Sequence, residues 1–137
     1  MSHQTTITVD TLGRDTYDIS RQVADVIEQS GVENGTCQVF VQHTSASLIL
    51  CENADPDVRH DLEVFMSRLV RDGDPGYRHS SEGPDDMAAH IRTVLTHDSL
   101  NIPVIAGSPG LGTWQGIYLW EHRTHPHRRK VVITVCG

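Results

Sequence analysis

The sequence of 137 residues has few cysteines, few aromatic side chains and no long apolar run, and each shortage excludes a class of protein. Its three cysteines, Cys37, Cys51 and Cys136, form no CxxC pair, so neither a zinc ribbon nor a dithiol redox motif is present. No segment approaches the length of a transmembrane helix. Cys37 and Cys136 stand in apolar surroundings and are expected to be buried thiols. Because aromatics make up only 5%, Trp114 and Trp120 are expected to carry much of the packing.

Familiar catalytic signatures are missing as well. The chain has no GxSxG, P-loop, dinucleotide-binding or HExxH motif. Its first residues lack the basic and apolar regions of a signal peptide, which predicts a cytoplasmic protein. The length fits one domain that spans residues 1–137.

The charge is negative overall but unevenly placed. A formal net charge of −7 argues against a general nucleic-acid or membrane-surface binder. Acidic residues crowd positions 55–86, while Arg123, Arg128, Arg129 and Lys130 gather near the end. The acidic centre suits a cation, and the basic cluster suits a small anion such as phosphate.

Apolar periodicity predicts three helices among strands. The helices are expected from an N-cap at Ser20 to Gly31, from Asp55-Pro56 to about Val70, and from Asp85 to Thr96. The strands are expected at 5–9, 14–19, 36–41, 47–51, 99–105, 113–121 and 130–135. This order predicts an α+β fold with a mostly antiparallel sheet. The apolar segments 100–105 and 130–135 are expected to be buried on both faces, which indicates a sandwich or an oligomer interface.

One candidate site lies around the start of the third helix. Asp86 and His90 are one helical turn apart and present a carboxylate and an imidazole together, as a metal pair or as an acid–base pair. Acids are also common in a first helical turn because they interact well with the helix dipole, so a structural role for Asp86 stays open.

Other polar groups follow predicted strands. His43 begins a run of hydroxyl residues that could bind an anion or orient a water, or could form an ordinary polar turn. Glu52 and Asn53 have no evident structural role. Glu121 and Arg123 should share one face of a strand and His122 the other. Nothing beside the serines indicates an oxyanion hole, so serine nucleophilic catalysis lacks support.

Several segments together resemble the YjbQ-like family, whose small proteins are described as secondary thiamine-phosphate synthases. The resemblance rests on segments that span nearly the whole chain in the same order: 42–48 (QHTSASL), 52–53 (EN), 55–61 (DPDVRHD), 82–90 (EGPDDMAAH) and 112–117 (GTWQGI).

The resemblance implies an α+β sandwich that assembles as a trimer around a polar pocket able to hold a divalent metal, Mg²⁺ or Zn²⁺. Such an enzyme would join hydroxymethylpyrimidine pyrophosphate to thiazole phosphate and release pyrophosphate. The implied catalytic residues are His43, Glu52, His79, Asp86 and His90. The implied metal ligands are His43, His79, His90 and Glu121. The implied substrate- or phosphate-binding residues are Thr44, Ser45, Asn53, Gln115, Arg123 and Arg129.

Two alternatives remain beside the synthase. One is a hydrolase that uses the same metal and histidines. The other is a trimeric metal- or ligand-binding protein whose turnover is incidental. Neither requires a nucleic acid or a membrane as partner.

Overall fold

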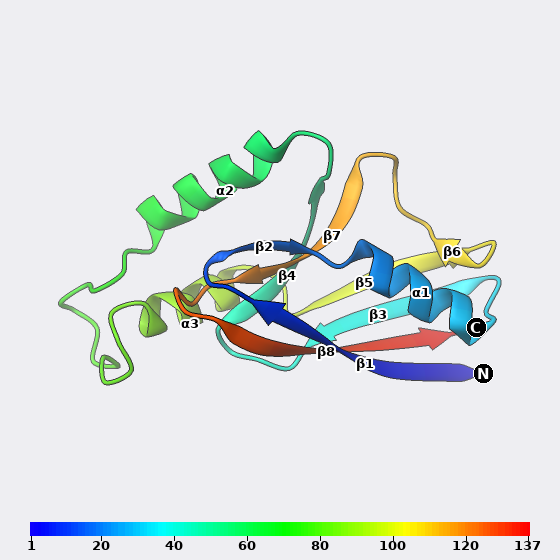
Figure 1. Ribbon diagram of the computed structural model, residues 1–137, viewed down its shortest axis with the longest axis horizontal. Helices are drawn as coiled ribbons and strands as arrows, with labels where there is room; N and C mark the ends of the chain where they lie inside the picture. Colours follow the sequence, from blue (N-terminus) through cyan, green and yellow to red (C-terminus); the bar gives the residue numbers. More distant parts are fainter.

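Two antiparallel sheets and three helices make up the computed structural model, which describes residues 1–137 (Figure 1). The five-stranded sheet has the order β1 (Ser2–Thr11), β8 (His127–Cys136), β3 (Gly35–Val41), β5 (Ser99–Ile105) and β6 (Ser108–Pro109). The three-stranded sheet has the order β2 (Asp15–Asp18), β7 (Gln115–Glu121) and β4 (Ala46–Glu52). The helices are α1 (Ser20–Ser30), α2 (Pro56–Leu69) and α3 (Asp86–Leu95). The predicted α+β fold with antiparallel sheets is therefore confirmed.

The main core lies between the two sheets and includes α1. Val23 of α1, Val39 of β3, Leu119 of β7 and Ile133 of β8 all belong to one cluster of 19 buried residues. Within the single chain, segments 100–105 and 130–135 are buried on one face only, because buried residues alternate with exposed or half-buried ones in β5 and β8. This alternation leaves the outer face of the five-stranded sheet open.

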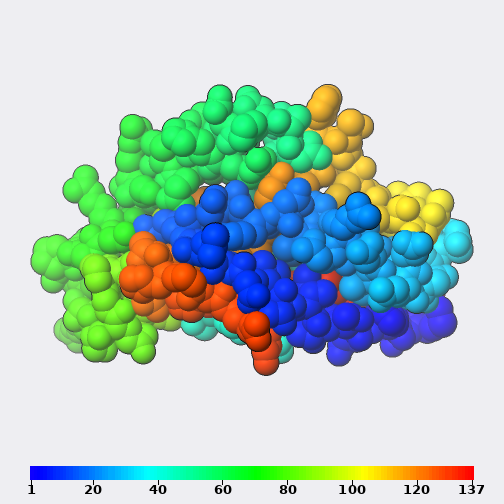
Figure 2. Space-filling view, in the orientation of Figure 1, coloured from blue at the N-terminus to red at the C-terminus, as the bar shows by residue number.

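Helices α2 and α3 cover the other face of the three-stranded sheet. Met66 of α2 and Ala88 of α3 pack with Tyr118 and Trp120 of β7 in a second buried cluster. Helix α2 lies above β2 and forms the upper left edge of the molecule (Figures 1 and 2). None of the three helices is long and apolar enough to cross a membrane.

Local signals placed most helix ends correctly. Asp55 caps α2, since its carboxylate accepts the backbone N–H of Asp57. Gly31 ends α1 in the left-handed conformation. Ser20, however, is the first residue of α1 and not its N-cap, because its hydroxyl accepts the backbone N–H of Ile117 instead.

Two residues expected to be packed are exposed in the single chain. Cys136 is exposed near the end of β8, and Trp114, in the turn before β7, is 62% exposed. Cys37 and Trp120 are buried as expected.

Candidate functional site

Three predicted residues converge where α3 begins. His79 comes from the loop between α2 and α3, while Asp86 and His90 lie one turn apart on α3. The Nε2 atom of His79 is 2.6 Å from Asp86 Oδ2, and the Nε2 atom of His90 is 3.4 Å from the same oxygen. One ligand atom from each residue lies within 4.8 Å of the others. We call these three residues the triad.

The ring nitrogen of His90 that does not face Asp86 binds a backbone carbonyl, and this bond determines the tautomer of the ring. His90 Nδ1 is 3.1 Å from the carbonyl oxygen of Thr44, so Nδ1 carries the hydrogen and donates it. In a neutral ring, Nε2 then offers a lone pair toward the Asp86 carboxylate. Two acceptors that face each other are stabilised by a cation or a proton between them. Two imidazoles and one carboxylate fit a divalent metal with an open coordination position, and nitrogen donors favour Zn²⁺ over Mg²⁺.

Arg123 holds the carboxylate of the triad in place. Its Nε and NH1 donate to Asp85 and Asp86 at 2.8 and 2.9 Å, and its NH2 donates to the carbonyl oxygen of Glu82. Burial raises the pKa of Asp86, but the hydrogen bond from His79 and the charge of Arg123 outweigh it and leave this pKa below its usual range. These bonds use three of the five guanidinium N–H groups of Arg123, so its role as a phosphate ligand stays a prediction.

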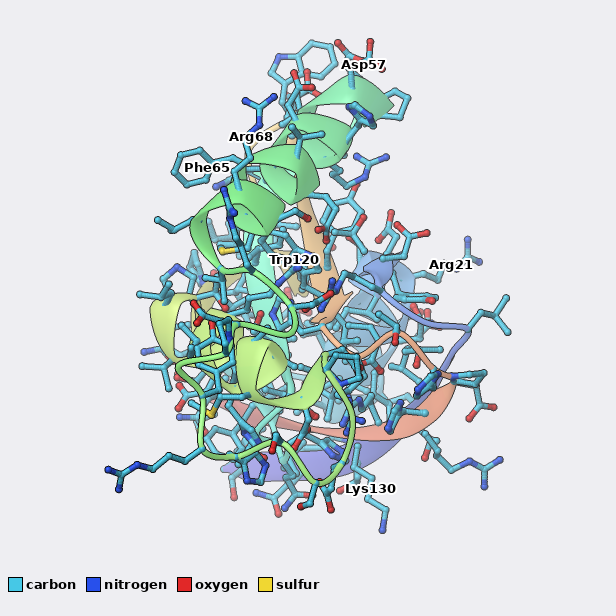
Figure 3. All side chains as sticks on the ribbon, turned by 90° about the vertical axis from the view of Figure 1, so that its left-hand side faces the viewer. Arg21, Asp57, Phe65, Arg68, Trp120 and Lys130 are labelled. Atoms are coloured by element: carbon cyan, nitrogen blue, oxygen red, sulfur yellow. The ribbon has the colours of Figure 1, made fainter.

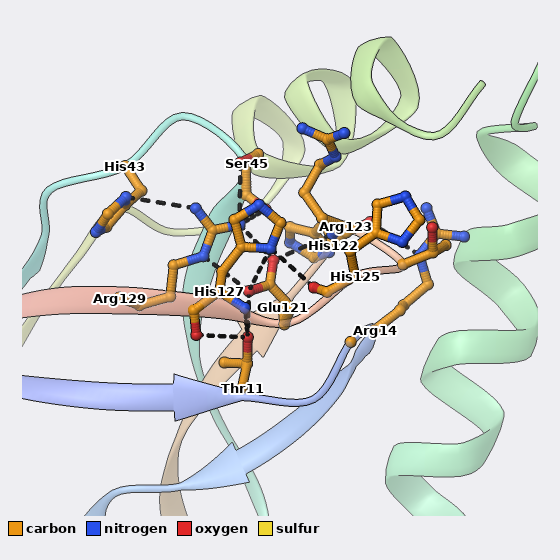
Figure 4. A network of polar contacts seen from close by, with 12 residues as sticks. Thr11, Arg14, His43, Ser45, Glu121, His122, Arg123, His125, His127 and Arg129 are labelled. Atoms are coloured by element: carbon orange, nitrogen blue, oxygen red, sulfur yellow. Dashed lines mark hydrogen bonds and ion pairs between the residues drawn. The ribbon is translucent and has the colours of Figure 1, made fainter. Parts of the chain in front are cut away.

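Glu121 and Arg129 form a buried ion pair outside the triad (Figure 4). Arg129 Nε donates to Glu121 at 2.8 Å, and Thr11 donates to the same carboxylate at 2.7 Å. Arg129 NH2 also donates to the hydroxyl and the carbonyl oxygen of Ser45. These contacts correct three assignments. Glu121 is not among the residues clustered as metal ligands. Arg129 and Ser45 bind each other and do not form an open phosphate-binding site.

His43 lies beside this ion pair and not in the triad. Its Nε2 accepts the backbone N–H of Lys130 at 2.8 Å, which corrects its assignment as a metal ligand. Desolvation, followed by the charge of Arg129, lowers the pKa of His43, so the ring is neutral at pH 7. His43 and His90 nevertheless line one hollow of about 560 Å³. The other lining residues are Thr44, Thr93, Val94, Thr96 and Asp98.

The remaining predicted residues lie at the opposite end of the same strand pair. Ala46 of β4 is opposite Glu121 of β7, whereas Glu52 is opposite Gln115. Six residues of strand separate the two ends, a distance of about 20 Å. At this far end the Asn53 side-chain amide donates to the carbonyl oxygen of Gln115 at 3.4 Å. One chain therefore does not bring Glu52, Asn53 and Gln115 to the triad, so a pocket shared with the triad would require a second subunit, and this part of the expectation stays a prediction.

Sequence reasoning missed a second, fully buried histidine cluster. His122 Nδ1 accepts from Arg92 Nε at 3.1 Å, so Nε2 carries the hydrogen and donates to the Ser47 hydroxyl at 2.8 Å. Arg92 also pairs with Glu63 of α2, which accepts the Trp120 indole N–H. Desolvation, then the charge of Arg92, lowers the pKa of His122 to about 2. A substrate cannot reach this serine, because Ser47 and His122 are both 0% exposed.

Fold and site together define an α+β sandwich with a metal-type triad at the start of α3. The chain belongs to the family described as UPF0047 protein YjbQ-like, whose model matches residues 5–137. It is 51% identical over 135 residues to UPF0047 protein sll1880 of Synechocystis sp., covering 98% of this chain and 92% of that protein. It is 43% identical over 141 residues to UPF0047 protein YjbQ of Escherichia coli O157:H7, covering 100% and 99%.

Solved structures have the same fold. A YjbQ/UPF0047-family protein of Clostridium acetobutylicum matches with a TM-score of 0.88 at 35% identity, covering 96% of this chain and 99% of that one. The hypothetical protein APE1520 of Aeropyrum pernix matches with a TM-score of 0.89 at 31% identity, covering 98% of each chain.

Proposed function

We propose that this chain is a metal-dependent enzyme acting on a phosphorylated small molecule, with the triad as its metal site. The observation that carries the proposal is the pairing of His90 and Asp86, whose acceptor atoms face each other 3.4 Å apart. Zinc is the metal that best suits the donor set. A bound divalent cation would neutralise phosphate charge at the triad.

Within that class, thiamine-phosphate synthesis is the named reaction that we propose. The hollow beside His90 has room for the organic part of a substrate, at about 560 Å³. His43 lines the same hollow as a neutral imidazole, with Nε2 bound to the backbone N–H of Lys130. Glu52 and Gln115 have no part in this proposal.

A metal-dependent hydrolase is the second candidate. The observation in its favour is that Arg123 and Arg129 pair with carboxylates within the protein, so their charges are already compensated and do not favour binding of a second phosphorylated substrate such as thiazole phosphate. The zinc-loaded protein should be incubated with hydroxymethylpyrimidine pyrophosphate, with and without thiazole phosphate. Thiamine phosphate as product supports the synthase, pyrophosphate cleavage without transfer supports the hydrolase, and background rates for both contradict the proposed enzyme.

We further propose that the chain assembles as a homotrimer, as the family resemblance implies. Four large apolar residues on α2 and α3 are more than half exposed, among them Phe65, which points away from the body of the chain (Figure 3). The other three are Leu69, Val94 and Leu95. Exposed apolar side chains of this size favour a protein interface. Light scattering coupled to size exclusion measures the mass directly, and a monomer of 15.2 kDa contradicts the proposal.

A further inference from the structure

The buried ion pair of Glu121 and Arg129 has no direct contact with the triad. Two series of hydrogen bonds nevertheless connect this ion pair to the triad. Glu121 is 0% exposed and Arg129 is 3% exposed, so water does not weaken this pair. The close-up shows the pair between the strand that carries Thr11 and the turn that carries Ser45 (Figure 4).

The first chain of contacts ends on His90. Arg129 NH2 donates to the Ser45 carbonyl oxygen at 3.2 Å and to its hydroxyl at 3.0 Å. The backbone N–H of His122 donates to the same carbonyl oxygen. These bonds fix the backbone beside Thr44, whose carbonyl oxygen accepts the hydrogen of His90 Nδ1. The orientation of that carbonyl decides which nitrogen of His90 faces Asp86.

The second chain of contacts ends on Asp86. The second oxygen of Glu121 accepts the backbone N–H of Arg123 at 3.1 Å. The side chain of Arg123 then donates to Asp86 Oδ1 at 2.9 Å and to Asp85. One carboxylate therefore anchors the strand end from which Arg123 reaches the triad.

We infer that Glu121 and Arg129 are positioning residues that set the tautomer of His90 and the orientation of Asp86. The inference rests on the proposed metal site and deepens it. It gives both residues a role that differs from metal or phosphate binding. Partners that orient metal ligands through hydrogen bonds typically contribute 10- to 100-fold to metal affinity, so loss of this pair should weaken metal binding by about that factor.

A second ion pair, on the helix that carries Asp86 and His90, provides a control for the loss of the Glu121–Arg129 pair. Arg92 of α3 is 0% exposed and pairs with Glu63, as Arg129 pairs with Glu121. Arg92 also donates to His122, which is hydrogen-bonded to Ser47, and neither residue belongs to the triad. Breaking it with Glu63→Gln should lower stability and leave the triad intact.

Cobalt(II) is the metal probe, because its visible absorption reports ligand geometry as well as affinity. The double variant Glu121→Gln/Arg129→Met removes both charges together, which leaves no unpaired buried ion. The glutamine oxygen replaces only one of the two carboxylate oxygens, which accept from Thr11 and from the backbone N–H of Arg123. We expect cobalt affinity about 10- to 100-fold below that of the wild type with an altered absorption band, while Glu63→Gln keeps both wild-type values. Arg129→Lys serves as a second variant that retains the charge but loses one of the nitrogens that bind Ser45.

A second readout does not depend on metal. Imidazole ¹⁵N spectra of the metal-free protein should show hydrogen on Nδ1 of His90 in the wild type, and a mixture of tautomers in the double variant. Wild-type cobalt affinity, spectrum and tautomer in a folded double variant would overturn the positioning role while leaving the proposed metal site standing. If the wild type itself binds no cobalt, the metal site fails, and the positioning role fails with it.

Discussion

Two histidine clusters share helix α3 and differ in how completely their polar atoms are paired. In the triad, the side chain of His90 is 32% exposed and its Nε2 faces a carboxylate. In the buried cluster, His122 is 0% exposed and both its ring nitrogens have partners, Ser47 and Arg92. An accessible histidine nitrogen that faces a carboxylate without a hydrogen between them indicates a site for a cation or a proton. A buried histidine whose two ring nitrogens both have hydrogen-bond partners indicates a structural role.

Breaking the buried cluster should have the largest effect on stability. Arg92→Met leaves Glu63 without its ion partner and His122 Nδ1 without its donor. We expect the free energy of unfolding to fall by about 2–4 kcal/mol, because His122 Nδ1 is left buried without a donor, whereas the unpaired Glu63 is 31% exposed and is partly solvated. Urea unfolding at pH 7 with a chelator present measures this value. His90→Ala is the control, expected to change stability by less than about 1 kcal/mol, and equal losses for both variants would remove the contrast between the clusters.

Breaking the triad should affect metal binding rather than folding. Asp86→Asn keeps the shape of the side chain but removes the charge next to both histidines. Zinc affinity measured by competition with a chelating dye should fall by more than about 100-fold, since a ligand matters more than the residues that orient it. Asp61→Asn is the matched control, because Asp61 also pairs with a histidine, His60, but is exposed on α2. Similar losses for the two variants would argue against the triad as the site.

The buried cluster should also make the protein sensitive to mild acid. The pKa of His122 is lowered from 6.5 to about 2 in the folded state, so below pH 6.5 the unfolded state binds a proton that the folded state does not. Stability from this group is present above pH 6.5 and is lost as the pH falls below it, by about 2 kcal/mol between pH 7 and pH 5.

The variant His122→Gln isolates this contribution, because glutamine does not titrate. Urea unfolding of both proteins at pH 7 and pH 5 should show that the wild type loses about 2 kcal/mol more than the variant over this range. Parallel losses in the two proteins would mean that His122 is not held neutral by its surroundings.

The smallest effect is expected at a helix end far from either cluster. Asp55→Ala removes the side-chain oxygen that caps α2, at a cost of about 1 kcal/mol. Asp25→Ala on the exposed part of α1 is the control and should be close to neutral. Thermal unfolding compares the two. An effect of Asp55→Ala as small as that of Asp25→Ala would show that the cap contributes little.

The fold could be predicted from the sequence mostly where signals are local. The Asp55-Pro56 start and the apolar spacing that follows predicted α2, and Gly31 predicted the end of α1. Burial was harder, because the pairing of strands decides which face is covered. The apolar composition of β5 indicated two buried faces, whereas its neighbours leave one face exposed.

The site could be predicted in part for the same reason. Asp86 and His90 are neighbours within one helical turn, so their spacing alone brought them together. Glu121 and Arg129 belong to strands of different sheets, and no local pattern distinguishes an internal ion pair from two exposed ligands. Arg92 gave no signal, since a lone arginine on an amphipathic helix is usually solvated.

The most direct test of the account is the metal content of the purified, tag-free protein, measured for the wild type, His90→Ala and His122→Gln. The account predicts close to one zinc per chain in the wild type and in His122→Gln, and little or none in His90→Ala. A wild type that lacks metal and takes up none on titration, or a His90→Ala variant that retains the full amount, would contradict it.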